Sequence, residues 1–381
     1  MGFLAEKDIQ TKALVVETPG APFVLKDVIL DEIQPSELLV DIKYAGLCHT
    51  DLVVQEGKMP IGSYPVIPGH EGAGVILKLG TGLQESGLKV GDRVILSYCS
   101  CLNCSACKAG RKGACENIAF INFGGSRGGG ESESAARLPN GQAIRGDFFG
   151  QSSFRKFATV DARAVVKYDG PVENLSFLAP MGCGYMTGAA TVMNVLKPKP
   201  TSSVAIFGLG AVGLSALMAA KSENVQDIIA IDILESRLEM AAAMGATKTI
   251  NAKGAEPVEG VIREAFPSGV NFVIDTTGSA KVISSGIALL AHGGTAAVVG
   301  TPRPGDLIEV EALDMLIHCK TVLGITGGYC DPQKFIPGLI RLFEDGSFPI
   351  DKLCKTYPPS EIDHAIKDMK SGKVVKPVLA W

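Results

Sequence analysis

Four cysteines lie within one short segment of the chain. Cys101, Cys104, Cys107 and Cys115 follow the spacing Cys-x2-Cys-x2-Cys-x7-Cys. Four thiolates so spaced can complete a tetrahedral zinc shell with no open position, which is a structural zinc site. Free buried cysteines are the alternative, but such spacings rarely coincide by chance. Cys99 stands outside the pattern, and we interpret it as a bystander, with ligand exchange left open.

Three further potential zinc ligands are dispersed along the chain: Cys48, His70 and Cys183. Each alone has an ordinary interpretation, because a single buried Cys or His more often packs than binds a metal. Their spacing does not join them into one site. Two thiolates and one imidazole would leave a zinc ion one position open for substrate.

A glycine-rich turn follows the apolar run 204–207 and precedes a helix-forming segment; it reads Gly208-Leu209-Gly210-Ala211-Val212-Gly213. Strand, turn and helix in this order indicate a dinucleotide site, where the helix N-terminus meets the phosphates. Asp232 ends the next apolar run. A carboxylate there accepts hydrogen bonds from a ribose diol and repels a 2′-phosphate. The pattern therefore predicts NAD rather than NADP, with a solvated strand-end Asp as the alternative.

The elements that must position these groups differ along the chain. Residues 10–170 show short β-like runs with frequent breakers, whereas six apolar runs alternate with helix-length segments beyond residue 200. That alternation predicts a doubly wound parallel sheet. With 381 residues, of which 46% are apolar, the sequence predicts an α/β protein of two domains.

Composition also excludes several classes of function. A net charge of −4 offers no broad basic face, so we expect no nucleic-acid partner. The longest uncharged apolar stretch, 204–220, contains three glycines and is short for a membrane span. Since residues 1–10 carry charges and no apolar signal core, we expect a cytoplasmic protein with no membrane partner.

The motifs together resemble the zinc-dependent medium-chain alcohol dehydrogenase family over nearly the whole chain. The resemblance is carried, in family order, by Cys48-x-Thr50-Asp51, Gly69-His70-Glu71-Gly72-Ala73-Gly74, the four-cysteine segment, Cys183-Gly184-x-x-Thr187-Gly188, the Gly208–Gly213 turn and Asp232. The stretch Phe148-Phe149-Gly150-Gln151-Ser152-Ser153-Phe154 is similar to the aryl (benzyl) alcohol dehydrogenase branch.

This resemblance implies a GroES-like β-rich catalytic domain at residues 1–184 and 328–381, and a Rossmann NAD-binding domain at 185–327. It implies two zinc ions per chain, a catalytic one on Cys48, His70 and Cys183 and a structural one on the four-cysteine segment. The implied reaction is reversible hydride transfer between a primary, aromatic or apolar alcohol and NAD.

The resemblance also assigns roles near the catalytic zinc. Thr50 would accept the alcohol's proton, Asp51 would orient His70, and Glu71 would lie behind the zinc as an occasional ligand. Many members carry a histidine where this chain has Val53. The proton would then pass from the cofactor ribose directly to solvent, or with the help of His49.

Other contacts are implied by the same resemblance. His49 and Lys376 are expected at the cofactor phosphates, Thr187 at the nicotinamide, Arg237 at the adenine, and Val299 and Thr301 at the carboxamide. The residues expected to line an apolar substrate pocket are Tyr98, Met59 and Phe148.

Two other functions remain open from the sequence. One is a relative with altered chemistry, such as a glutathione-linked formaldehyde dehydrogenase or an alkene reductase in a biosynthetic pathway. The other is a non-catalytic binder of NAD and zinc. By analogy with the family we expect a homodimer that pairs through the edge of the Rossmann sheet, with the run 271–299 supplying that edge.

Overall fold

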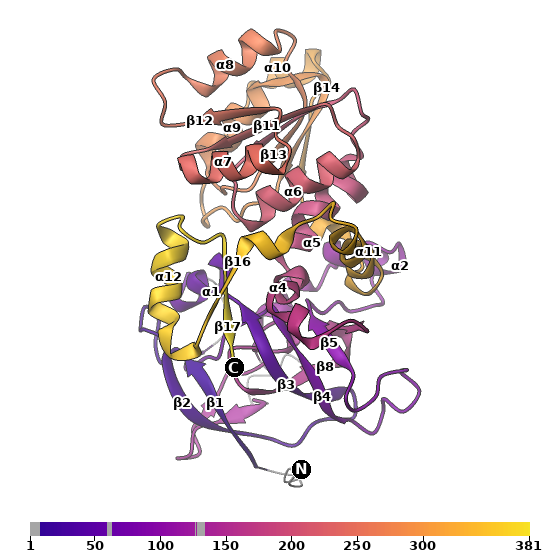
Figure 1. Ribbon diagram of the computed structural model, residues 1–381, viewed down its shortest axis with the longest axis vertical. Coiled ribbons are helices and arrows are strands. Elements are labelled where there is room, and N and C mark those ends of the chain that lie inside the picture. Colours follow the sequence, from indigo (N-terminus) through magenta and orange to yellow (C-terminus); the bar gives the residue numbers. More distant parts are fainter. Residues whose placement is uncertain (1–7, 59–62, 126, 128–133) are drawn as a thin grey trace. The chain divides into compact units, whose positions relative to one another are not determined.

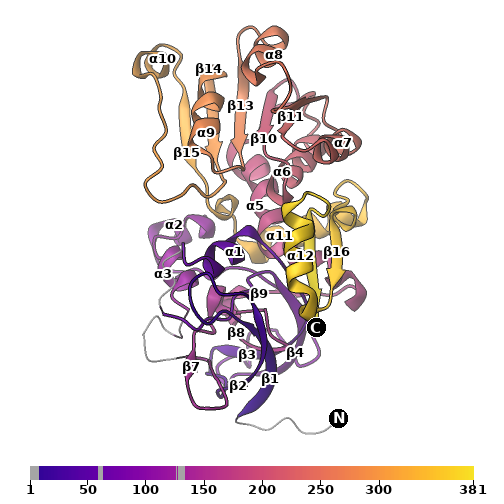
Figure 2. The same ribbon diagram turned by 90° about the vertical axis from the view of Figure 1, so that its left-hand side faces the viewer.

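The computed structural model describes residues 8–58, 63–125, 127 and 134–381. The chain divides into two compact units (Figures 1 and 2). Unit 1 comprises Met1–Cys183, Asp331–Ile340 and Ile350–Trp381, and unit 2 comprises Gly184–Cys330 and Arg341–Pro349. The first crossing between them, at Cys183/Gly184, lies one residue before the expected one, and the short segment Arg341–Pro349 belongs to unit 2 rather than to unit 1.

Unit 1 is built around two sheets. The larger has the order β16 (Cys354–Tyr357), β17 (Lys376–Ala380), β3 (Glu37–Gly46), β4 (Gly72–Leu79), β5 (Arg93–Leu96), β9 (Val165–Tyr168), with β8 (Phe157–Asp161) also paired to β3. The smaller has the order β1 (Ile9–Val15), β2 (Val24–Leu30), β6 (Ala136–Arg137), β7 (Ala143–Ile144). All pairings except that of β16 with β17 are antiparallel.

The antiparallel strands of unit 1 form around apolar residues that alternate or run together. Leu14, Leu38, Val40 and Ile42 from β1 and β3 are fully buried in one hydrophobic core. The helical segments are short: α1 (His49–Gln55), α2 (Ser105–Lys108), α3 (Ile118–Phe123), α4 (Leu175–Leu178) and α12 (Ile362–Lys370). Several strand ends and the short helices beside them carry the candidate site residues.

Unit 2 is a six-stranded, wholly parallel sheet. Its order is β12 (Lys248–Asn251), β11 (Asp227–Asp232), β10 (Ser203–Phe207), β13 (Val270–Asp275), β14 (Leu290–Val298), β15 (Thr321–Gly324). Its α-helices are α5 (Gly184–Ala190), α6 (Ala211–Ser222), α7 (Glu235–Met244), α8 (Val258–Ala265), α9 (Ala280–Ala288) and α10 (Ala312–Ile317), while α11 (Pro332–Glu344) is shared between the units. The predicted six strands and the doubly wound fold are confirmed.

The strand order corrects one prediction. The run 271–299 contains β13 and β14, which both lie inside the sheet, and the free edge on that side is β15. The order reverses at β10, whose two neighbours β11 and β13 lead to opposite ends of the sheet. Ligands of such sheets bind at the carboxyl ends of the strands beside this reversal.

Candidate active site

Cys48, His70 and Cys183 come together in unit 1 although they are far apart in the sequence. Cys48 precedes α1, His70 precedes β4, and Cys183 follows the short helix Ala179–Gly182. Their ligand atoms, together with a carboxylate oxygen of Glu71, all lie within 4.8 Å of one another. The three residues that the family resemblance joined therefore form one cluster of metal-ligand type.

The donor set fits zinc. His70 is fully buried, and its Nε2 atom has no hydrogen-bond partner among the described residues. A buried imidazole nitrogen without a partner is costly unless it binds something. Two thiols and this nitrogen are the ligand types of zinc sites that keep a position open for substrate.

Asp51 accepts hydrogen bonds from two of the three candidate zinc ligands. Its carboxylate is fully buried; Oδ1 accepts hydrogen bonds from His70 Nδ1 and Gly69 N, and Oδ2 accepts one from Cys48 N, all at 3.0 Å. One carboxylate thus links the segments that carry two of the three ligands. It also fixes the His70 tautomer that leaves Nε2 free for a metal.

Electrostatics favours a thiolate at Cys48. Its pKa lies well below the usual thiol value, first because the Cys183 thiol donates a hydrogen bond to it, and further because Lys376 and His70 lie near. The same hydrogen bond raises the pKa of Cys183. Burial alone would lower the pKa of His70, but Asp51 and Cys48 raise it above its usual value.

Glu71 is bound by Lys376. The Lys376 ammonium donates to Glu71 Oε1 at 2.9 Å and Oε2 at 2.8 Å, and both side chains are buried. Burial raises the pKa of Glu71, and the ammonium opposes this rise. A side chain on Gly46 would overlap Glu71 Oε2, so this position must be glycine for the carboxylate to lie here.

The structure gives Lys376 a contact that the sequence analysis did not expect. Its ammonium is only 3% exposed and is directed at Glu71 and, at 3.4 Å, at Leu47 O. The ammonium is thus a partner of the carboxylate beside the metal-ligand cluster, and its contact with the cofactor phosphates stays a prediction. The sequence gives no signal for this, since Lys376 and Glu71 are 305 positions apart.

Sequence reasoning missed two positioning residues. Buried Gln151 donates to the backbone oxygens of His70 and Ser97 at 3.0 and 2.9 Å and accepts from Gly72 N at 3.0 Å. Ser97 Oγ donates to Gly182 O at 2.6 Å, directly before Cys183. The available signal for Gln151 was its position as a long polar side chain between the phenylalanines of the 148–154 stretch.

Aromatic rings pack on the His70 imidazole. Phe148 lies edge-on at 5.5 Å between ring centres, and Phe149 lies tilted over it at 4.7 Å. Phe148 is fully buried, whereas Phe149 is half-buried and its φ of 55° is left-handed. Non-glycine residues in this conformation concentrate at functional sites.

Two of the three predicted substrate-pocket residues lie in the part of the chain that the structure describes, and both are buried. Phe148 and Tyr98 are 0% and 5% exposed, whereas Phe149, which the sequence analysis did not select, is half-buried. The substrate contacts of Phe148 and Tyr98 stay predictions. Met59 lies outside the described residues.

Thr50 and His49 begin α1 beside the cluster. Thr50 Oγ1 lies 3.8 Å from Cys48 Sγ and is half-buried, while His49 is exposed. Val53, on the same helix, carries no titratable group. The geometry leaves the Thr50 relay and the His49 phosphate contact as predictions.

The four-cysteine segment forms a second cluster. The sulfurs of Cys101, Cys104, Cys107 and Cys115 all lie within 4.8 Å of one another. Backbone N–H groups donate to these sulfurs, as Cys104 N does to Cys101 Sγ at 3.3 Å. Such bonds, led by that from Asn103 N, lower the pKa of Cys101 to about 6. Four converging sulfurs fit a closed zinc shell.

Cys99 lies apart from both clusters. It is buried, its backbone N–H and C=O are bonded by the Asn122 side chain, and burial raises its pKa well above the usual value. Its sulfur lies near Phe149 O at 3.9 Å. The interpretation of Cys99 as a bystander remains the simpler one.

In unit 2, the glycine turn lies between β10 and α6 as the motif requires. Gly208 has a left-handed φ of 88°, a side chain on Gly213 would overlap Gly208 O, and a Cβ on Gly210 would meet nothing within 4 Å. The first glycine therefore permits the turn, the third permits close helix packing, and the space at Gly210 suits the approach of a pyrophosphate.

Asp232 ends β11 and faces this turn. Its Oδ2 accepts from Leu209 N at 2.6 Å, and its Oδ1 accepts from Ile233 N and Leu234 N. The carboxylate is thus held at the mouth of the glycine turn, the position the motif assigns to the ribose contact. Arg237 on α7 is buried, and burial lowers its pKa while Asp232 opposes this.

The remaining cofactor candidates lie in unit 2. Val299 and Thr301 follow β14, with Val299 N bonded to Asp275 O at the end of β13. Thr187 is half-buried on α5. Val299 therefore lies at the carboxyl edge of the sheet, as does the glycine turn; the contacts of all three residues with a cofactor stay predictions.

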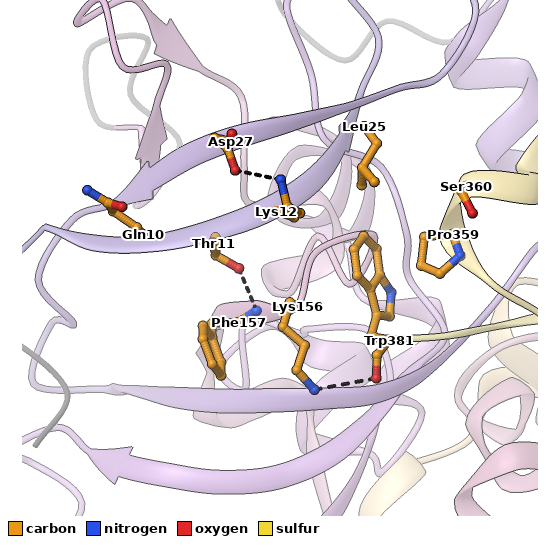
Figure 3. Close-up of a pocket in the computed structure, with 10 residues that line it drawn as sticks. All are labelled: Gln10, Thr11, Lys12, Leu25, Asp27, Lys156, Phe157, Pro359, Ser360 and Trp381. Carbon is orange, nitrogen blue, oxygen red and sulfur yellow. Dashed lines mark hydrogen bonds and ion pairs between the residues drawn. The ribbon is translucent and has the colours of Figure 1, made fainter. Parts of the chain in front are cut away.

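One hollow in unit 1 lies apart from the candidate site. Figure 3 shows this hollow of about 460 Å³, with Trp381, Leu25 and Phe157 among its walls. None of the residues of the two metal-ligand clusters lines this hollow. Lys12 and Asp27 form an ion pair at its rim, at 2.9 Å.

Comparisons with known proteins agree with this geometry. The alcohol dehydrogenase GroES-like domain family matches residues 34–170, and the zinc-binding dehydrogenase family matches residues 211–345. A geraniol dehydrogenase of Castellaniella defragrans is 36% identical over 375 residues, covering 98% of each chain.

Two solved structures are similar over nearly their whole length. An alcohol dehydrogenase zinc-binding domain protein from Burkholderia ambifaria has 39% identity and a TM-score of 0.92, covering 97% of this chain and 98% of its own. A benzyl alcohol dehydrogenase from Acinetobacter calcoaceticus has 39% identity and a TM-score of 0.90, covering 97% and 99%.

The chain belongs to the zinc-dependent medium-chain alcohol dehydrogenase family, whose named members are oxidoreductases acting on CH–OH groups. This confirms the resemblance drawn from the motifs. Among the described residues, none of the helices is both long enough and apolar enough to cross a membrane.

Proposed function

We propose that this chain is an NAD-dependent alcohol dehydrogenase for primary aromatic or similarly planar, apolar alcohols, working in either direction. The observation that carries the proposal is the buried cluster of Cys48, His70 and Cys183, with an unpartnered His70 Nε2. Zinc, when bound, supplies Lewis acidity toward the alcohol oxygen, and NAD accepts the hydride.

Different residues of the chain have different roles in this reaction. Cys48, His70 and Cys183 hold the metal, and Asp51 keeps His70 in the ligating tautomer. The Thr50 hydroxyl, at the start of α1, takes up the proton of the alcohol and passes it on, by way of the ribose or His49 because Val53 cannot carry it.

Lys376 supports an open metal position. By holding both Glu71 oxygens at 2.8–2.9 Å, the ammonium competes with a metal for that carboxylate. Three protein ligands then remain, which leaves room for a substrate oxygen. A non-catalytic binder would instead need a closed shell. The three retained ligands also argue against an alkene reductase, whose chemistry does not require the metal.

The cofactor preference rests on Asp232. Its carboxylate lies beside the Gly208–Gly213 turn through its bond to Leu209 N. A 2′-phosphate brought to this acid would meet like charge, so we propose NAD over NADP. The four sulfurs of the cysteine segment support a second, structural zinc, which makes two ions per chain.

The proposed substrate class rests on the turn Phe148–Gly150, the aromatic turn. Phe149 offers a half-buried ring over the zinc-ligand imidazole, and ring–ring contacts favour planar substrates. The names of two relatives agree, since one is a benzyl alcohol dehydrogenase and the other a geraniol dehydrogenase.

We also propose a homodimer and a cytoplasmic location. β15 has only one neighbour in its sheet, and the residues before it expose apolar side chains, with Leu307 83% and Leu316 74% exposed. A second copy pairing along β15 would cover both the free edge and these side chains. Sedimentation should give twice the chain mass of 39.8 kDa, and Leu316→Asp should shift it to the monomer.

The substrate proposal is tested by initial rates of NADH formation from NAD with benzyl alcohol, ethanol and a long-chain alcohol. We expect benzyl alcohol to have the highest kcat/KM, and Phe149→Ala to reduce this advantage by raising KM for benzyl alcohol alone. Equal kcat/KM for benzyl alcohol and ethanol would contradict the aromatic assignment while leaving the dehydrogenase assignment intact.

A further inference from the structure

The Gln151 carboxamide lies in unit 1 between backbone segments that lead to two of the candidate zinc ligands. The side chain is fully buried and makes three hydrogen bonds. Its Nε2 donates to His70 O at 3.0 Å and to Ser97 O at 2.9 Å, and its Oε1 accepts from Gly72 N at 3.0 Å. The carboxamide therefore joins the segment at the start of β4 to the residue that follows β5.

Ser97 extends this connection to a third segment of the chain. Its fully buried hydroxyl donates to Gly182 O at 2.6 Å, and Cys183 is the next residue. Two side chains thus connect the backbone of one zinc ligand, His70, to the backbone directly before another. We call this pair of side chains, Gln151 and Ser97, the Gln151–Ser97 link.

Two glycines allow the backbone to pack closely around this link. A Cβ on Gly182 would lie 1.8 Å from Leu96 O, so a side chain there would push this segment away from the end of β5. A Cβ on Gly72 would lie 2.6 Å from Ser153 Cβ and 3.0 Å from Gln151 Oε1. The segments therefore meet at distances that residues with a side chain do not permit.

The hydrogen bonds described for Asp51 connect the segments of the other two ligands. Its carboxylate accepts from Cys48 N and from His70 Nδ1, both at 3.0 Å. Cys183 follows a separate short helix, and its own N–H donates to Pro180 O within that helix at 3.3 Å. The Gln151–Ser97 link thus supplies the connection from His70 to the third ligand segment.

We propose that Gln151 is a positioning residue that, through Ser97, holds Cys183 in place as a ligand of the catalytic zinc. This inference rests on the proposed metal site at Cys48, His70 and Cys183. Removing the carboxamide releases His70 O and Ser97 O, so that the end of β5 and the segment bonded to it can shift relative to His70. Since metal affinity and ligand geometry depend on such supporting hydrogen bonds, loss of the link changes both.

The test is cobalt(II) binding by the full chain with zinc kept in the four-cysteine segment, because the absorption bands of bound cobalt report the arrangement of its ligands. Gln151→Met keeps the length of the side chain and removes its hydrogen bonds. We expect it to raise the cobalt dissociation constant of the catalytic cluster about 10–100-fold. We also expect it to weaken the thiolate-to-cobalt absorption, to which the Cys183 sulfur contributes. Gln142→Met, the same substitution at an exposed residue of unit 1, should change neither.

Ser97→Ala is a second variant, which decides the matter if Gln151→Met fails to fold. It leaves the carboxamide bonds in place and removes only the bond to Gly182 O. We expect it to raise the cobalt dissociation constant about tenfold. Because both side chains act in one link, their effects on the logarithm of this constant should not add in the double variant. Additive effects would show that Gln151 does not act through Ser97 and would overturn the proposal.

Native cobalt affinity with an unchanged spectrum in Gln151→Met would overturn this inference and leave the proposed dehydrogenase function intact. Equal loss of metal from the four-cysteine segment in both single variants would also overturn it, because a general loss of structure would then explain the result. A native chain that binds no cobalt at Cys48, His70 and Cys183 would overturn the proposed function together with this inference.

Discussion

The substitution Asp51→Asn examines how far the zinc cluster depends on one buried carboxylate. In the native chain its two oxygens accept from Gly69 N, His70 Nδ1 and Cys48 N, each at 3.0 Å. An amide offers one accepting oxygen and one donating nitrogen. Whichever way the Asn amide turns, at least one of these donors must face its NH2 group.

The size of the effect follows from that mismatch. Losing a hydrogen bond to a charged acceptor, with a buried donor left unsatisfied, costs about 2–3 kcal/mol. We therefore expect Asp51→Asn to lower the free energy of unfolding by about this amount. Because two of the three donors belong to zinc-ligand residues, the affinity for the catalytic zinc should fall about 10–100-fold, as for other metal-supporting carboxylates.

The assays are urea unfolding and competition for zinc with a chromogenic chelator, on protein loaded with zinc. Asp92→Asn serves as the control, since Asp92 bonds Lys89 N in a surface turn and faces Lys167 at 3.2 Å. An Asp51→Asn chain that retains native zinc affinity would refute the reasoning that this carboxylate fixes the His70 imidazole.

Four further substitutions test other parts of the account. Cys104→Ser should lower the zinc content from two ions per chain to one, while the exposed Cys319→Ser should leave it unchanged. Asp147→Asn should stabilise the chain at pH 7.5: burial raises the pKa of Asp147 to about 6 in the folded state, against about 3.8 unfolded, and this makes stability fall between these pH values, by up to about 3 kcal/mol. This gain in stability should vanish in unfolding experiments near pH 3.5. Its persistence there would contradict a raised pKa of Asp147 in the folded state. Asp232→Asn should weaken NAD binding relative to NADP, and an unchanged ratio of the two dissociation constants would exclude Asp232 as the selecting group. His49→Ala should raise the dissociation constant of NAD, and unchanged affinity would remove His49 from the cofactor site.

Local patterns allowed much of this fold to be predicted. The six strands of unit 2 are short, continuous apolar runs because both faces of a parallel sheet are buried, and such runs are visible in the sequence. The spacing of Cys101 to Cys115 is likewise local, and the structure brings these four sulfurs together.

Features set by long-range packing were not predictable in the same way. Cys48, His70 and Cys183 could be joined only through family resemblance, and the pairing of Lys376 with Glu71 has no local signal. The edge of the unit 2 sheet was misplaced because strand order depends on how the crossovers run rather than on order along the chain.

The aromatic turn shows a further limit. Neighbouring phenylalanines look equivalent in the sequence, but Phe149 has a left-handed φ and is half-buried, whereas Phe148 is fully buried. The two neighbouring rings therefore differ in backbone conformation and in burial. Nothing in the residue types alone distinguishes them.

The central claim is hydride transfer at the zinc cluster of unit 1. The most direct measurement is a turnover experiment with benzyl alcohol deuterated at the carbinol carbon, NAD and the zinc-loaded chain, followed by mass spectrometry of the reduced cofactor. The account predicts one deuterium in each NADH molecule formed, and loss of the reaction in Cys48→Ser with NAD binding retained. Undiminished turnover in Cys48→Ser, or no deuterium in the cofactor while zinc and NAD are both bound, would contradict it.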